Sequence, residues 1–88
     1  MSDQISVDVL RSQPPETRPS SDAVLFVGGM LGGQIRSMPT TVDDDGPLPF
    51  NGLAHGHPVR HVYRLTGWRP DPGVWVYTCD EVTMRSPA

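Results

Sequence analysis

Three histidines lie close together near the middle of the chain, at His55, His57 and His61. In an extended segment alternate side chains point the same way, so the first two imidazoles could bind one zinc ion. Gly56 and Pro58 make this segment flexible, and we expect its histidines to face solvent in a loop. A small metal-binding module, or a metal-dependent enzyme that uses these histidines, is the alternative.

Acidic residues at two other places could complete such a ligand set. The triplet Asp43–Asp45 precedes Gly46, and Asp80 follows the last strongly alternating segment. The triplet also resembles the start of a calcium-binding loop, but the glutamate that closes such a loop is missing at the required spacing. We therefore interpret the triplet as a solvated turn.

The single cysteine, Cys79, could act as a nucleophile if one of the histidines served as its base. It continues the alternation of Trp75 and Tyr77, which favours a small packed residue instead. One cysteine forms no internal disulfide, a composition typical of a reducing compartment. We expect no catalysis and no cofactor.

Four glycines lie in the segment Gly28–Gly33. A phosphate-binding loop would end in Gly-Lys-Ser/Thr and lead into a helix, and the sequence has neither feature. A turn between two strands explains the glycines better, because several of its positions then tolerate positive φ. The apolar run Ala23–Val27 predicts the first strand, and Gln34–Met38 predicts the return strand, which Pro39 ends.

The clearest element is a β-hairpin near the end of the sequence. Residues His61–Trp68 and Val74–Cys79 both alternate, and a Pro- and Gly-rich turn at 69–73 joins them. Residue types enriched at protein-binding hot spots gather in this hairpin: Tyr63, Arg64, Trp68, Arg69, Trp75 and Tyr77. They predict a protein-binding surface, although the aromatic members could equally form the core of so small a chain.

The other segments predict little regular structure. Residues 1–22 are rich in Pro, Ser and Asp, and they predict a flexible or extended arm. Within the arm Ile5, Val7 and Val9 alternate, so it could add a strand to a sheet edge or stay a disordered tail. The prolines and glycines of residues 40–60 predict a long central loop.

Together these patterns predict a mainly β fold. We expect a small antiparallel sheet of three to five strands in a domain over residues 23–88, with low helix content. The chain has 88 residues and is 36% hydrophobic, so its core is expected to be thin. A protein partner or a second copy would add stability.

The segment Gly28–Gln34, together with a terminal hairpin that carries Tyr63–Leu65 and Trp75–Tyr77, resembles small uncharacterised proteins of phages infecting actinobacteria. The resemblance covers roughly residues 23 to 80. It implies a phage-encoded accessory protein but no known activity. On this basis we expect a non-enzymatic protein-binding protein, associated with the capsid or tail of the virion, or an early protein that modulates a host protein.

Charge and hydropathy narrow the partners further. The net charge is −3, so no broad positive field would attract a nucleic acid. The longest uncharged stretch, 23–35, is shorter than a membrane span and contains four glycines. Acidic residues precede it, which is unlike a secretory signal. We expect the host cytoplasm or the virion as its location and a protein as its partner.

Overall fold

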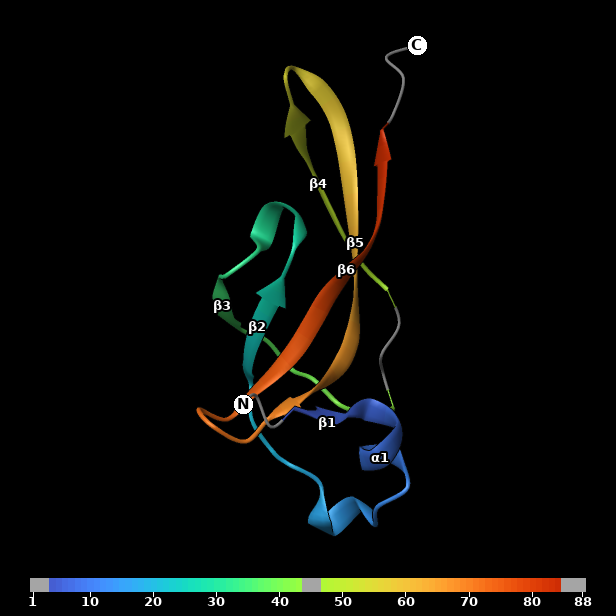
Figure 1. Cartoon of the computed structure of the whole chain (residues 1–88), viewed down its shortest axis with the longest axis vertical. Coiled ribbons are helices and arrows are strands. Elements are labelled where there is room, and N and C mark those ends of the chain that lie inside the picture. Colours follow the sequence, from blue (N-terminus) through green and yellow to red (C-terminus); the bar gives the residue numbers. More distant parts are fainter. Residues whose placement is uncertain (1–3, 44–46, 85–88) are drawn as a thin grey trace.

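The computed structural model describes residues 4–43 and 47–84. It is elongated, with extents of 48 × 23 × 21 Å (Figure 1). In chain order its elements are β1 (Ile5–Ser6), α1 (Val7–Arg11), the 3-10 turn η1 (Pro15–Thr17), β2 (Ala23–Val27), the 3-10 turn η2 (Gly29–Leu31), β3 (Ile35–Ser37), β4 (Leu48–Ala54), β5 (His57–Arg69) and β6 (Val74–Met84).

The strands confirm the prediction of a mainly β fold. Over residues 4–43 and 47–84 they form one six-stranded sheet in the order β1-β5-β6-β2-β3, and β4 also pairs with β5. The sheet therefore has more strands than the three to five expected. It is also mixed, because β2 runs parallel to β6. Sequence alternation identifies hairpins between neighbouring strands, whereas this pairing joins strands that are far apart in the chain.

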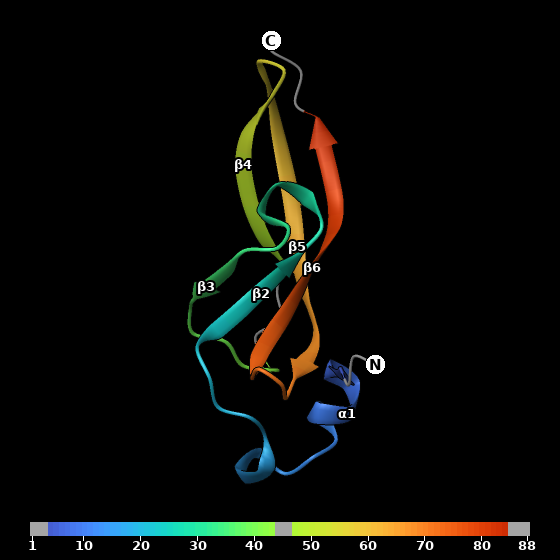
Figure 2. The same cartoon turned by 60° about the vertical axis from the view of Figure 1, so that its left-hand side comes forward.

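Both predicted hairpins are present. The strands β2 and β3 pair antiparallel around the glycine turn, as Ala23–Val27 and Gln34–Met38 predicted. The strands β5 and β6 form the terminal hairpin, and both are longer than the alternation indicated. Figure 2 shows that the far halves of these two strands, with β4 beside them, extend away from the rest of the molecule. We call this part the distal extension; it comprises residues 48–63 and 79–84.

A β-bulge on β5 places Trp68 on the core side of the sheet. Leu65 pairs with Tyr77, and the next pairs along are Gly67 with Val76 and Trp68 with Trp75, so Thr66 is the inserted residue. Without the insertion, residues 65 and 68 would point to opposite faces. With it, the rings of Trp68 and Trp75 meet edge to face, with centroids 5.0 Å apart.

A second bulge, on β6, has the same effect in the distal extension. Tyr63 pairs with Cys79 and Val62 pairs with Glu81, so Asp80 is the inserted residue. Val82 then pairs with His61 and lies on the same face as Cys79, although three positions separate the two. The bulge thus continues one apolar face along β6.

The central loop predicted for residues 40–60 is wrong over its second half, which forms β4 and the start of β5. Pro49 is tolerated because β4 is an edge strand that pairs with β5 alone in the described sheet. A tight turn joins the strands at His55 and Gly56, which have φ of 54° and 79°. Two positive φ values in a two-residue loop are characteristic of a type I′ hairpin turn. Residues 44–46 lie outside the described part.

Aromatic rings form the centre of the core. Phe26 of β2, Phe50 of β4 and Tyr63 of β5 contact one another edge to face, with centroids 5.1 to 5.7 Å apart. Contacts of this geometry each stabilise a fold by about 0.5–1.5 kcal/mol beyond the burial of their area. Tyr77 adds a fourth ring at 5.9 Å from Phe26. In the described sheet β2 pairs with neither β4 nor β5, so the contacts of Phe26 with Phe50 and Tyr63 join strands that are not neighbours.

The predicted arm is wrong for the residues that the structure describes from Gln4 onward. Ile5 and Ser6 pair with β5, as the edge-strand interpretation proposed, but the chain then turns into α1. The Ser6 side chain caps this helix by accepting a hydrogen bond from the Val9 amide at 3.4 Å. Leu10 is 1% exposed and belongs to the core cluster, so this segment is an integral part of the domain.

Two arginines fasten this segment to the chain before β4. The Arg11 Nε donates to the Val42 carbonyl at 2.9 Å. The Arg18 side chain donates to the carbonyls of Leu10 and Arg11 at 3.2 and 3.0 Å, and it pairs with the Asp43 carboxylate at 3.2 Å. Guanidinium groups suit this role because they carry several donors in one plane.

Leu10→Ala tests whether the N-terminal segment belongs to the core. The substitution removes a fully buried side chain and should lower the free energy of unfolding by about 2–5 kcal/mol. The matched control is Val9→Ala, because Val9 is 49% exposed on the same helix. Urea denaturation measures both values. Equal, small losses for the two variants would show that the segment is not packed as described.

Candidate functional site

The six hairpin residues predicted to bind a protein do not form one surface. Tyr63, Trp75 and Tyr77 are 0%, 1% and 2% exposed, so the structure assigns them to the core and the prediction is wrong for them. Their side chains belong to the core cluster that also contains Leu10 of α1 and Leu31 of η2, so a partner does not reach them in the folded chain. The alternative in which the aromatics form the core holds for these three.

The other three residues have separate environments. Trp68 is partly buried against the core. The Arg64 Nε pairs with an Asp80 carboxylate oxygen at 2.9 Å, and both side chains are half exposed. Arg69 is partly buried, and its Nε has no hydrogen-bond partner in the described part of the chain. Arg64 lies four residues from Trp68 along β5, and Trp68 and Arg69 point to opposite faces, so the three residues do not define one contact surface.

The glycine turn is fixed to the sheet by the hydroxyl of Tyr63. This hydroxyl donates to the Gly28 carbonyl at 2.6 Å and accepts from the Leu31 amide at 2.9 Å. Gly29 has φ of 64°, and a Cβ there would lie 2.6 Å from the same hydroxyl and 2.7 Å from the His61 Nδ1. The turn therefore needs glycine at position 29 for both its backbone conformation and its space.

His61 and Cys79 lie side by side beneath this turn. The Cys79 Sγ is 3.9 Å from the His61 Nδ1, which also accepts a hydrogen bond from the Met30 amide at 3.2 Å. The ring nitrogen nearest the thiol is therefore engaged in holding the turn. Cys79 packs partly buried against the core, which agrees with its interpretation as a small packed residue.

The three histidines are not gathered at one point. His55 lies in the turn between β4 and β5, His57 begins β5, and both are exposed. His61 lies four residues further along the strand, about 13 Å away for an extended chain. Among residues 4–43 and 47–84, no group of three or more His, Cys, Asp or Glu side chains lies close enough to hold a metal ion. The arrangement thus gives the metal-site alternative no geometric support.

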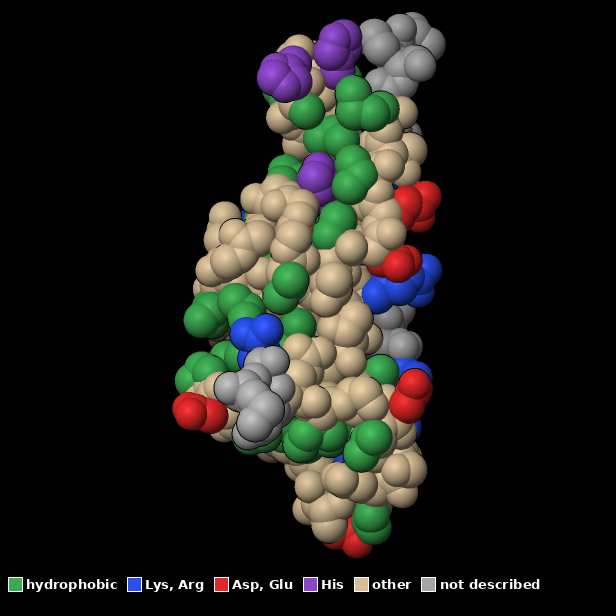
Figure 3. Space-filling model, in the orientation of Figure 1, with side chains coloured by type: hydrophobic (Ala, Val, Ile, Leu, Met, Phe, Trp, Pro, Cys, Tyr) green, Lys and Arg blue, Asp and Glu red, His purple; other side chains and the backbone are tan. Residues whose placement is uncertain are grey.

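Exposed apolar side chains gather on one face of the distal extension. Val82 is 54% exposed and Met84 is 61% exposed, and their cross-strand partners are His61 and Val59. Met30 is 41% exposed, and its side chain occupies the space that a Cβ at Gly52 would need. Figure 3 shows hydrophobic side chains around a histidine on this part of the molecule. We call the set Met30, Val82 and Met84 the distal apolar face.

The opposite face of the distal extension carries charged side chains together with Leu53, which is 75% exposed. Arg60 pairs in register with Thr83, and Glu81 pairs with Val62, so these side chains lie on the face away from the core. The Arg60 Nε donates to the Asn51 side chain at 3.1 Å. The two faces of the extension therefore differ in charge, and among the described residues Val82 and Met84 stay more than half exposed on the uncharged face.

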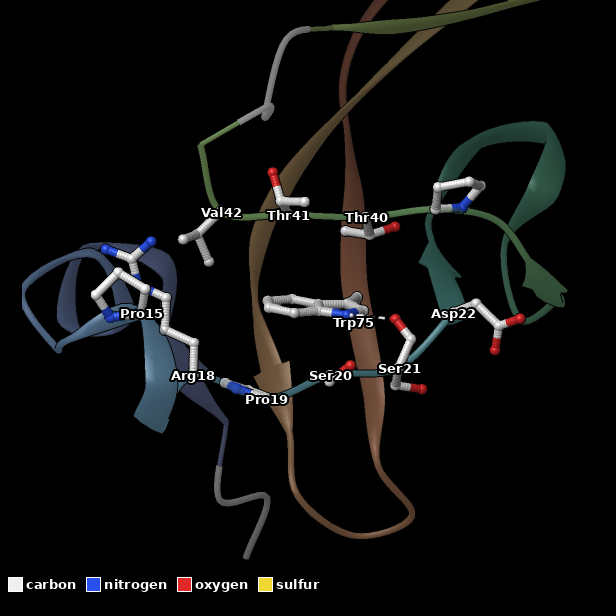
Figure 4. A pocket seen from close by; sticks show the side chains of 11 residues that line it. Pro15, Arg18, Pro19, Ser20, Ser21, Asp22, Thr40, Thr41, Val42 and Trp75 are labelled. Carbon is white, nitrogen blue, oxygen red and sulfur yellow. Dashed lines mark hydrogen bonds between the residues drawn. The ribbon is translucent and has the colours of Figure 1, made fainter.

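A cavity of about 750 Å³ lies at the other end of the molecule, between residues 15–22 and residues 39–42. Figure 4 shows the Trp75 indole between these two segments, with its Nε1 hydrogen bonded to the Ser21 carbonyl. The indole is 1% exposed, so it offers almost no surface to a ligand. Arg18, the cation of this cavity, already binds Leu10, Arg11 and Asp43. The cavity thus has few polar groups left to recognise a ligand.

The sequence interpretation missed the distal apolar face because it ended the last strand at Cys79. The alternation resumes at Val82 and Met84, but the bulge at Asp80 shifts its phase by one residue. Allowing one inserted residue after Cys79 would have revealed this continuation.

Comparisons with protein-family models, with curated proteins and with solved structures find no match to this chain. Among the described residues, no helix is long and apolar enough to cross a membrane.

Gly29→Ala tests the attachment of the glycine turn. The new methyl group would contact the Tyr63 hydroxyl and the His61 ring in addition to adopting a strained φ. Gly33→Ala is the matched control, because Gly33 has φ of 85° with nothing within 4 Å of its Cβ position. In thermal or urea unfolding, Gly29→Ala should cost about 1–3 kcal/mol more than Gly33→Ala, the usual range for overpacking. If the two variants lose the same stability, the turn is not packed on β5.

Proposed function

We propose that this chain is a non-enzymatic protein-binding protein whose contact surface is the distal apolar face. The observation that supports it is the exposure of Val82 and Met84, at 54% and 61%, on an ordered strand of the sheet. Single exposed apolar residues are common on protein surfaces and need no explanation. Here they lie beside one another on one face and continue the buried face of the same strands.

The rigidity of the surrounding backbone favours binding. Met30 lies on a turn that the hydroxyl of Tyr63 and the ring of His61 hold in place. Val82 and Met84 lie on β6, which pairs with β5 through residue 84. A partner that docks here orders few new groups, so less of the binding free energy is lost to conformational entropy.

The biological setting proposed is that of a phage-encoded accessory protein. Its support is the resemblance of Gly28–Gln34 and of the terminal hairpin to small proteins of phages infecting actinobacteria. In that setting the partner is a subunit of the virion, or else a host protein bound after infection. Either partner requires an exposed contact surface and neither requires a catalytic group.

Val82→Asp tests the distal apolar face as the contact surface. A carboxylate buried in an apolar contact should weaken partner binding by about tenfold or more, whereas the exposed position should leave folding intact. The matched control is Leu53→Asp, because Leu53 is 75% exposed and its partner Pro58 places it on the opposite face. Tagged wild-type and variant chains are compared for retention of purified phage particles and of proteins from host extract.

The expected result is a partner retained by the wild type and by Leu53→Asp but not by Val82→Asp. Retention of virion particles would identify the partner as a virion subunit. Retention of a host protein would identify the chain as an early protein that acts after infection. Equal retention of the same partner by both variants would remove the distal apolar face from the proposal.

A further inference from the structure

Among the residues that the structure describes, the distal half of β6 has a backbone edge without a neighbouring strand. On its inner side β6 pairs with β5 as far as Met84. On its outer side it pairs with β2, and this pairing ends at Thr78 within the described residues. Figures 1 and 2 both show the end of β6 at the margin of the sheet. From Asp80 to Met84 the outward N–H and C=O groups of alternate residues are therefore placed for pairing with another strand.

We propose that this edge pairs antiparallel with the same edge of a second copy of the chain. A two-fold axis through the pair at Val82 would oppose Val82 to its own copy, Glu81 to Thr83, and Asp80 to Met84. This arrangement is isologous, so each copy contributes the same residues, and the two sheets join into one. The proposal rests on the proposed function, because it names the first partner of the same distal extension.

The charge of Glu81 favours an axis at Val82 over an axis at Glu81. An axis at Glu81 would oppose two carboxylates on one face, which is unfavourable between directly opposed residues. With the axis at Val82, Glu81 of the second copy lies opposite Thr83, and Thr83 pairs with Arg60 within the chain. Two strand spacings, about 10 Å between backbones, then separate Glu81 of the second copy from Arg60, with a short side chain between them. By symmetry this juxtaposition of Glu81 and Arg60 occurs twice, with the Arg60 Nε donating to Asn51 on the other side of β5.

The remaining acid of this edge is already neutralised within the chain. Asp80 forms an ion pair with Arg64 at 2.9 Å, so it adds little repulsion in a dimer. Val82 and Met84 lie on the core-side face, and pairing therefore brings the distal apolar faces of two copies side by side. The dimer buries Val82 against its own copy and leaves a wider apolar surface for a further partner.

Two variants test the proposal: Glu81→Arg alone, and Glu81→Arg combined with Arg60→Glu. Sedimentation equilibrium over a range of chain concentrations measures the dissociation constant of each dimer. The wild type should self-associate to dimers. Glu81→Arg should weaken the dimer by about tenfold or more, because Arg would then face Arg60 of the second copy. The double variant Glu81→Arg/Arg60→Glu should return the dissociation constant to within about threefold of the wild type. The control Glu16→Arg makes the same charge change at an exposed site in η1 and should leave association unchanged.

A wild-type chain that is monomeric at millimolar concentration would overturn the proposal, and so would a double variant that is no better than Glu81→Arg. An edge reserved for a segment of another protein would also leave the isolated chain monomeric. The proposed function is tested separately, since Glu81→Arg keeps Val82 and Met84. Capture of a partner by a monomeric wild type leaves the function standing, whereas equal capture by Val82→Asp removes it. The dimer is judged from the Glu81 and Arg60 variants alone, because Val82 lies on its two-fold axis.

Discussion

The structure depends on keeping the large apolar side chains of β5 and β6 on one face of a long, narrow hairpin. Strict alternation would not achieve this, because the apolar residues of these strands do not keep a period of two. The bulges at Thr66 and Asp80 each insert one residue and restore the phase. The first returns Trp68 to the core, and the second carries the apolar face outward to Val82. The core and the candidate binding surface are therefore two parts of one face.

A core on one face of a small sheet must be covered by whatever the rest of the chain supplies. Leu10 from α1, Leu31 from η2 and Val42 from the segment before β4 are all buried against that face. These three residues come from short or irregular elements, and hydrogen bonds hold the elements in place. Arginine side chains fix the first and third, and the hydroxyl of Tyr63 fixes the second. Within the described residues this cover reaches Gly52 and His61 but leaves Val82 and Met84, at the far end of β6, more than half exposed.

Much of the fold could be predicted from local patterns, whereas the site could not. The glycine turn with its two strands and the terminal hairpin were predictable because alternation and turn residues are local signals. The strand β4 was missed because Pro49 argues against a strand, and only the sheet itself shows that β4 lies at an edge, where proline is tolerated. Residue type predicted binding by Tyr63, Trp75 and Tyr77, but burial decides whether a ring reaches a partner, and burial depends on segments distant in sequence. The local signal of the bulge at Asp80 is an alternation that resumes one residue out of phase at Val82 and Met84, and a strict period of two does not detect it.

The pairing of β5 with β6 beyond the bulge at Asp80 places Val82 on the core-side face, and solution NMR measures this pairing directly. The account predicts nuclear Overhauser contacts between the Val82 methyl groups and the His61 imidazole, with the side chains of Glu81 and Val62 together on the other face. Contacts of Val82 with Val62 or Arg60 instead would place it on the charged face. That result would contradict both the distal apolar face and the interface derived from it.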